Sequence, residues 1–200
     1  MSVLEQAKIA VEKATGLGRP GRDTIRDLVR ARKPNLSRFG DDGETPNHPK
    51  WPLVVYRSPV RLRNDFDPAA IFEDLFAANG WTNAWRNGVY DFLHFHTRRH
   101  EVLGIARGHV QVAFGGAKGK RLRLKAGDVA ILPAGTGHRR VSAGDDLLVV
   151  GAYPQNSGAY DEAKPSGGDH QEAFGEIARV PRPKTDPVYG SAGPLAAIWQ

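Results

Sequence analysis

The sequence contains no cysteine. Disulfides, cysteine-ligated zinc ribbons, iron–sulfur clusters and thiol catalysis are therefore excluded. It also lacks an apolar run as long as a membrane span. The first sixteen residues, MSVLEQAKIAVEKATG, carry four charges where a signal peptide would have an apolar core. We therefore expect a cytoplasmic protein with no membrane segment.

Most of the chain carries little net charge. The formal charge is +6, and residues 1–38 account for +5 of it, with nine Lys/Arg against four acids. The acids interleave with the bases, and no set of aromatic residues for stacking bases accompanies them. We therefore expect a basic helical extension that packs on the domain or on a partner subunit. Nucleic-acid contact is the alternative.

Changes in amino-acid composition and apolar pattern along the chain predict four segments. Residues 1–38 form the extension, with helices at 3–14 and 23–32. Residues 39–80 form a connector with a strand at 52–56 and a helix at 67–80. Residues 81–154 form an all-β core, and residues 155–200 a loop-rich extension that packs on it, with a short helix near 170–178 and Tyr189 and Trp199 as anchors.

The core segment has short apolar runs separated by glycines at close intervals, which is typical of an antiparallel barrel or sandwich. The expected strands lie near 87–96, 101–107, 109–114, 121–125, 129–132, 138–142 and 147–153.

Two histidines and a glutamate in this core have the spacing of metal ligands. In a strand, His94 and His96 would point to the same side, and two neutral imidazoles form a chelating pair. After a turn, Glu101 would share an inward face with Leu103 and Ile105. A lone carboxylate among aliphatic side chains is costly to bury, and a bound metal ion removes that cost.

A third histidine follows a rigid bend further along the chain. Pro133 restricts the backbone, Gly135 and Gly137 allow conformations closed to other residues, and His138 then opens a strand. His138 can reach the same interior and is the fourth candidate ligand. The alternative is that these four are satisfied polar residues of the core with no metal.

Together these residues resemble the two motifs of the cupin superfamily (RmlC-like proteins). The first runs from Gly88 through His-Phe-His at 94–96 and Glu101 to Gly108, and the second from Gly127 through Pro-Ala-Gly at 133–135 to His138. The resemblance implies a double-stranded β-helix, or jelly-roll barrel, in which three histidines and one glutamate bind a metal. Ser142 stands where the family often has asparagine, a residue that is not a ligand.

The likeness extends to a bacterial subgroup of cupins, the YjlB type. The stretches that carry it are DDGETPN, WRNGVYDFLHFHTRRHEVLGIARG, FGGAKG, AGDVAILPAGTGH and DPVYG. It covers about residues 39–199 and leaves the basic extension as an addition. Cupins frequently pair through edge strands, so the resemblance also implies a homodimer.

Other polar residues near the motifs have open roles. One of Arg98, Arg99, Arg139 and Arg140 could pair with an anionic substrate at the barrel mouth, or all could be solvated charges. His100 is expected beside the site as a loop or supporting histidine, with a proton shuttle or substitute ligand as the alternative. Tyr90 is expected to line the barrel; it and His100 are the candidates for a general base.

Two functions fit these residues. The first is a metal-dependent enzyme, dioxygenase-like or an isomerase or lyase, acting on a small organic molecule. The second is a non-catalytic binder or sensor of a metal or small ligand. The donor set accepts iron, manganese, nickel, zinc, cobalt or copper as one divalent transition metal ion.

Overall fold

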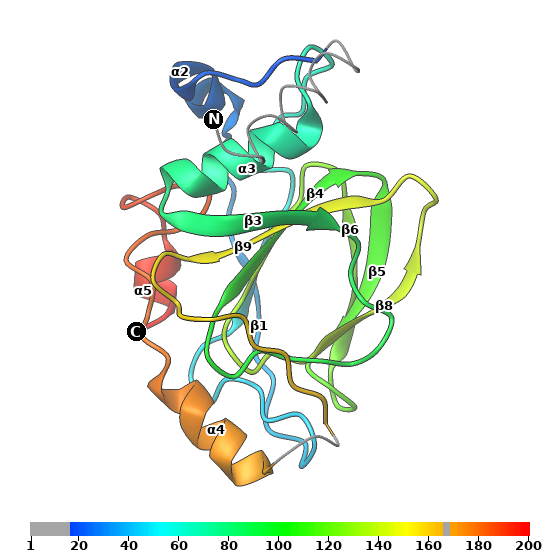
Figure 1. Cartoon of the computed structure of the whole chain (residues 1–200), viewed down its shortest axis with the longest axis vertical. Helices are drawn as coiled ribbons and strands as arrows, with labels where there is room; N and C mark the ends of the chain where they lie inside the picture. Colours follow the sequence, from blue (N-terminus) through cyan, green and yellow to red (C-terminus); the bar gives the residue numbers. More distant parts are fainter. Residues whose placement is uncertain (1–16, 166–168) are drawn as a thin grey trace.

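The chain forms two antiparallel sheets that face each other as the walls of a barrel (Figure 1). The computed structural model describes residues 17–165 and 169–200. Its strands are β1 (Asn35–Ser37), β2 (Leu53–Tyr56), β3 (Trp81–Asn87), β4 (Glu101–Arg107), β5 (His109–Phe114), β6 (Lys120–Lys125), β7 (Val129–Leu132), β8 (His138–Ala143) and β9 (Leu148–Pro154). Its helices are α2 (Arg22–Leu28), α3 (Pro68–Ala78), α4 (His170–Arg179) and α5 (Leu195–Ile198).

The order of the strands confirms the predicted double-stranded β-helix. The larger sheet has the order β1-β2-β7-β4-β9-β3 and the smaller one β6-β5-β8. Strands distant in sequence are neighbours, as in β4, which pairs with both β7 and β9. This crossing topology brings the starts of β4 and β8 to one interior.

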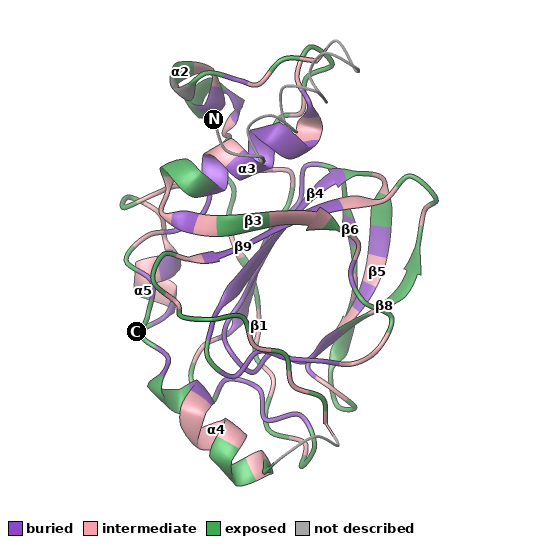
Figure 2. Ribbon diagram, viewed as in Figure 1, coloured by how far each residue is buried: buried purple, intermediate pink, exposed green. Residues whose placement is uncertain are grey.

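The strands β2, β7, β4 and β9 of the larger sheet are buried on both faces, which alternation along them explains (Figure 2). On β4, Leu103 and Ile105 join the core between the sheets, while Val102 joins the core on the other face. Helix α3 packs on that other face through Ile71 and Phe72. Because successive side chains of a strand point to opposite faces, every second residue of β4 lines the barrel.

Helix α3 begins and ends as its sequence predicts. The carboxylate of Asp67 accepts a hydrogen bond from the Ala69 amide at 3.0 Å, Pro68 occupies the first turn, and Gly80 follows the end with φ +76°.

The strand expected at 87–96 is wrong in its position. The strand is β3, six residues earlier, and residues 88–93 are irregular. Two isolated bridges follow, from His94 to His138 and from Phe95 to Ala163. The register of β3 shifts between Thr82 and Trp85, so a simple alternating pattern does not reveal this strand.

The N-terminal segments join the barrel more closely than an extension would. Helix α2 ends at Leu28, not at residue 32, because Val29 turns to pair with Val60. The strands β1 and β2 pair with the larger sheet, although they precede residue 81. The helix expected at 3–14 lies outside the described residues, and the division into four segments stays a prediction.

The C-terminal segment is anchored by aromatic residues, as expected. Trp199 is fully buried, stacks on Trp51 at 5.4 Å and donates a hydrogen bond to the carbonyl of Pro52. The hydroxyl of Tyr189 donates to the carbonyl of Arg30 at 2.9 Å. Within residues 17–165 and 169–200, no helix has the length and hydropathy needed to cross a bilayer.

Candidate metal centre

The structure brings the four predicted ligands together inside the barrel. His94 and His138 exchange two backbone hydrogen bonds, and Glu101 opens β4. Ligand atoms of His94, His96 and His138 all lie within 4.8 Å of one another, and all three residues are buried. The carboxylate of Glu101, also buried, lies 3.7 Å from Nε2 of His96 and 3.3 Å from Nε2 of His138.

Each of the three histidines is held by a backbone carbonyl at Nδ1. Nδ1 of His94 lies 3.2 Å from the carbonyl oxygen of Phe92, and Nδ1 of His138 lies 3.0 Å from that of Thr136. Nδ1 of His96 contacts the carbonyl of Asp161. A carbonyl only accepts, so the proton sits on Nδ1 and leaves the lone pair on Nε2. This tautomer is the one that metal-ligating histidines adopt.

The arrangement of acceptors fits a bound cation. With the proton on Nδ1, Nε2 of His138 cannot donate to Glu101, so two lone-pair-bearing atoms face each other at 3.3 Å. Consistent with this, Oε2 of Glu101 is buried and has no hydrogen-bond partner among the described residues. Leaving a buried acceptor unpaired is costly, and a cation between these atoms would remove that cost.

The electrostatics of the cluster favour positive charge beside Glu101. Burial opposes ionisation of this carboxyl, but the nearby ring of His96 outweighs it and holds its pKa below the ordinary value. Burial likewise disfavours a charged His96, yet Glu101 raises the pKa of that ring. Burial, with His138 nearby, lowers the pKa of His94 to about 3, so His94 is neutral and able to ligate.

The bend before β8 needs glycine at one position. Gly135 has φ +81°, and a Cβ there would lie 2.9 Å from the carbonyl oxygen of Asn47. Its amide donates to the carbonyl of His96 at 2.7 Å. The predicted role of this bend, which is to hold His138, depends on this hydrogen bond between the bend and the segment that carries His96.

A segment after β9 completes the surroundings of His96. The carboxylate of Asp161 accepts hydrogen bonds from the amide and hydroxyl of Thr97 and lies 3.2 Å from Nε of Arg99. Its backbone carbonyl is the partner of His96. Phe95 and Ala163 exchange two backbone hydrogen bonds beside it. The sequence offered no signal for this clamp, because Asp161 lies 65 residues from His96.

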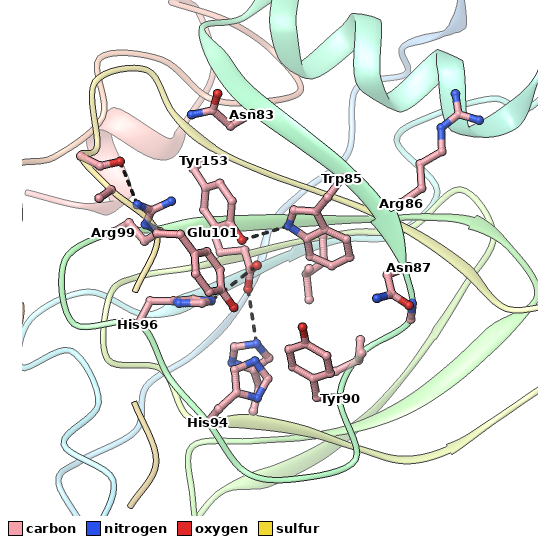
Figure 3. A pocket seen from close by; sticks show the side chains of 17 residues that line it. Asn83, Trp85, Arg86, Asn87, Tyr90, His94, His96, Arg99, Glu101 and Tyr153 are labelled. Carbon is pink, nitrogen blue, oxygen red and sulfur yellow. Dashed lines mark hydrogen bonds and ion pairs between the residues drawn. The ribbon is translucent and has the colours of Figure 1, made fainter. Parts of the chain in front are cut away.

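The four residues stand at the wall of a cavity of about 550 Å³ (Figure 3). That size suits a small organic ligand. The rest of the lining is largely aromatic or aliphatic and includes Trp85, Val89, Tyr90, Leu103, Tyr153 and Tyr160. Tyr90 lines the cavity as expected and is 42% exposed, which places it at the mouth.

Three aromatic residues of the cavity were not predicted from the sequence. Trp85, Tyr153 and Tyr160 come from β3, β9 and the segment after β9. The one available signal is Gly151 on β9, which pairs with Trp85; a Cβ there would lie 2.1 Å from the indole ring. Glycine thus leaves room for Trp85 to lie across β9.

Of the four arginines near the motifs, only Arg99 lines the cavity. Arg99 is 2% exposed, and its guanidinium lies 4.6 Å from the centre of the Tyr153 ring. Arg98 pairs with Glu176 on the surface, Arg139 is exposed, and Arg140 lies 3.7 Å from Asp91.

His100 serves the fold and not the cavity. Its Nδ1 accepts from the Ala134 amide at 2.9 Å, and its Nε2 lies 3.2 Å from the carbonyl oxygen of Pro181. It packs against Trp51 and Trp199. Both ring nitrogens have backbone partners and His100 is not among the residues that line the cavity, which fits the supporting histidine that the sequence predicts.

Comparison with known proteins places this chain in a family. A protein of Bacillus subtilis (strain 168), described as "Uncharacterized protein YjlB", is 37% identical over 161 residues, which cover 80% of this chain and 93% of that protein. The chain belongs to the YjlB family of cupins. No family model matches this YjlB-type sequence.

Several solved structures are similar to this YjlB-type chain at low sequence identity. Acireductone dioxygenase from Bacillus anthracis, with cadmium in its active centre, is 20% identical over 48% of this chain and 68% of that one, with a TM-score of 0.34. Oxalate decarboxylase from Bacillus subtilis is 16% identical over 58% and 28%, also with a TM-score of 0.34. A Klebsiella pneumoniae protein with a double-stranded β-helix domain is 16% identical over 70% and 92%, with a TM-score of 0.32. Similarity at this level does not transfer an activity.

Proposed function

We propose that this protein binds one divalent transition metal ion through His94, His96, Glu101 and His138 and is a metal-dependent enzyme acting on a small organic molecule. The observation that carries the proposal is the convergence of Nε2 of His96 and Nε2 of His138 on the carboxylate of Glu101, whose buried Oε2 has no hydrogen-bond partner among the described residues. Three imidazoles and one carboxylate suit iron, manganese, nickel, zinc, cobalt or copper.

When bound, such an ion would supply Lewis acidity, or redox chemistry if it is iron, manganese, nickel, cobalt or copper. The chain contributes the rest. Backbone carbonyls hold each imidazole in the ligating tautomer, and the apolar lining limits water around the substrate. The proposed reaction is an oxidation of the dioxygenase type, with isomerisation or lyase chemistry as the other class. The homodimer and the cytoplasmic location stay predictions.

Elemental analysis of natively purified protein tests the metal site. We expect about one metal ion per chain in the wild type and little in His96→Ala, because the variant loses one of four ligands. His109→Ala is the matched control, since His109 is an exposed histidine at the start of β5. A wild type that binds no transition metal on reconstitution, or a His96→Ala variant that retains it, would contradict the proposal.

Turnover is tested separately on the metal-loaded protein. Oxygen uptake with phenols, keto acids and thiols should detect a dioxygenase, and product analysis without oxygen should detect an isomerase or lyase. A stoichiometric metal with no turnover of any compound would favour the non-catalytic binder.

A further inference from the structure

The hydroxyl of Tyr153 is held with its proton free for a ligand. Tyr153 is buried on β9 and lines the cavity beside Glu101 and His96. Nε1 of Trp85 donates a hydrogen bond to its oxygen at 2.9 Å (Figure 3). An indole nitrogen can only donate, so this bond occupies a lone pair of the phenol and leaves its O–H unused. Among the described residues no acceptor takes a hydrogen bond from it.

The position of this hydroxyl is built into the sheet. Trp85 lies opposite Gly151 on β9, and its ring fills the space that a side chain at 151 would occupy. Tyr153 is two residues further along the same strand and therefore points to the same face. The ring of Tyr153 also lies 5.9 Å from that of His96. The hydroxyl consequently shares the hollow with the four proposed ligands.

Tyr153 remains a donor at neutral pH. A phenol ionises only at about pH 10 in water. A phenol in this environment keeps its proton and can give it to a hydrogen bond.

A second donor lies over the same ring. Nη2 of Arg99 donates to the carbonyl of Gly158 at 2.8 Å, and Nε lies 3.2 Å from Asp161. Nη1 has no hydrogen-bond partner among residues 17–165 and 169–200. Arg99 is almost fully buried and lines the cavity, and its buried Nε has no hydrogen-bond partner among the described residues.

The two carboxylates beside Tyr153 and Arg99 already face other groups of the protein. The carboxylate of Glu101 faces His96 and His138, and that of Asp161 holds Thr97 and Arg99. A ligand that satisfies Tyr153 and Arg99 must bring oxygen acceptors of its own. A negatively charged oxygen suits two donors of which one is cationic.

We propose that Tyr153, positioned by Trp85, and Arg99 bind a carboxylate or enolate oxygen of the substrate, which makes the substrate class small organic acids with a planar or apolar body. The aromatic lining from Trp85 and Tyr90 accepts that body. The inference deepens the proposed function and rests on it for the site, although the donors themselves hold no metal.

Benzoate and benzamide are the probes, because they share a ring and differ in charge. Their affinities for the full-length protein are measured by titration calorimetry or ligand-observed NMR. We expect benzoate to bind at least about tenfold more tightly than benzamide, since hydrogen bonds to a charged group are the stronger ones. Tyr153→Phe should weaken benzoate binding about tenfold or more while keeping the ring in place.

Tyr160→Phe is the matched control. Tyr160 lines the same cavity, but its hydroxyl donates to Glu162 at 3.1 Å, so its removal should change benzoate affinity less than twofold. The inference is overturned if benzoate does not bind, if benzamide binds equally well, or if Tyr153→Phe matches the wild type.

Metal content measured on the same samples separates the two proposals. If the protein binds no metal but still prefers benzoate in a way that depends on Tyr153, the metal-dependent function is contradicted and the proposed role of Tyr153 and Arg99 is supported. A stoichiometric metal with no dependence on Tyr153 would do the reverse. Circular dichroism of Tyr153→Phe confirms that a loss of binding is not a loss of fold.

Discussion

Buried histidines have two different roles in this chain, and the partners of their ring nitrogens separate them. In His94, His96 and His138 a carbonyl takes the proton of Nδ1 and Nε2 is left for a ligand. In His48 the pattern is reversed, because Nδ1 accepts from the amides of Lys50 and Trp51. Its ring stacks on Trp51 at 4.3 Å and stabilises a turn rather than a site.

This structural histidine makes stability depend on pH. Burial, assisted by Lys50, lowers the pKa of His48 from 6.5 to about 4. Between these values the unfolded chain binds a proton that the folded chain does not. The contribution of His48 to the free energy of unfolding is therefore complete above pH 6.5 and decreases as the pH drops towards 4. His48→Asn keeps an acceptor for the two amides and removes the titration. We expect the pH slope to decrease by up to about 1.4 kcal/mol per pH unit.

Urea denaturation at several pH values across this window measures that slope. His109→Asn removes an exposed histidine and should leave the slope unchanged. A His48→Asn slope equal to that of the wild type would show that another group carries the effect.

At the scale of residues, the sequence predicts what is local and misses what is distant. His94 and His96 are two residues apart and Glu101 follows after a short turn, so their convergence could be inferred. Tyr153 and Asp161 reach the same cavity from another strand and from an irregular segment. No periodic pattern links them to the motif, and only the topology of the sheet brings them there.

At the scale of elements, strands with regular alternation are predicted and distorted ones are not. The strands β4 to β9 lie within one or two residues of their expected positions. Most of them have apolar residues on a defined face, and β8 begins at a bend marked by proline and glycine. The strand β3 was missed because Asn83 has φ +55° and the register shifts there. The sequence predicts a helix over residues 23–32, but α2 ends at Leu28 because the residues after it form backbone hydrogen bonds with residues 59–61.

The segment after β9 gives an element-scale prediction. Asp161→Ala removes the carboxylate that holds Thr97 and Arg99 and should loosen the carbonyl that fixes His96. We expect metal affinity to fall about 10–100-fold, as is usual when a partner of a metal-binding histidine is disturbed. Competition with a chromophoric chelator measures this affinity.

Glu162→Ala is the control for this prediction. Glu162 is the next residue, and its carboxylate accepts a hydrogen bond only from the exposed hydroxyl of Tyr160 among the described residues. An Asp161→Ala protein that holds metal as tightly as Glu162→Ala would show that the clamp does not support the site.

At the scale of the whole molecule, the basic N-terminal region is part of the packed structure from residue 17 onwards. Ile25 and Leu28 of α2 are buried in the core that also holds α3. The guanidinium of Arg19 lies 3.2 Å from Glu73 and also pairs with Asp74. Composition alone showed only the excess of charge, because the apolar residues of α2 are too few to reveal which surface they cover.

Leu28→Ala tests this packing. Leu28 is 2% exposed, and truncating a buried leucine costs about 2–5 kcal/mol. Leu36→Ala is the matched control, because Leu36 on β1 is 51% exposed, and we expect it to stay within about 0.5 kcal/mol of the wild type. Equilibrium denaturation gives the free energy of unfolding of both variants. Equal values for Leu28→Ala and Leu36→Ala would mean that α2 does not contribute to the packed core.

The carbonyl of Asp161 also sets an order of events during synthesis. A nascent chain that has left the ribosome only as far as Pro154 would already contain His94, His96, Glu101 and His138. It would not yet contain the group that fixes the tautomer of His96. The cavity therefore acquires its final form only after the residues that follow the barrel have been synthesised. A product truncated at Pro154 would contain the four proposed ligands but would lack the carbonyl of Asp161 that fixes His96.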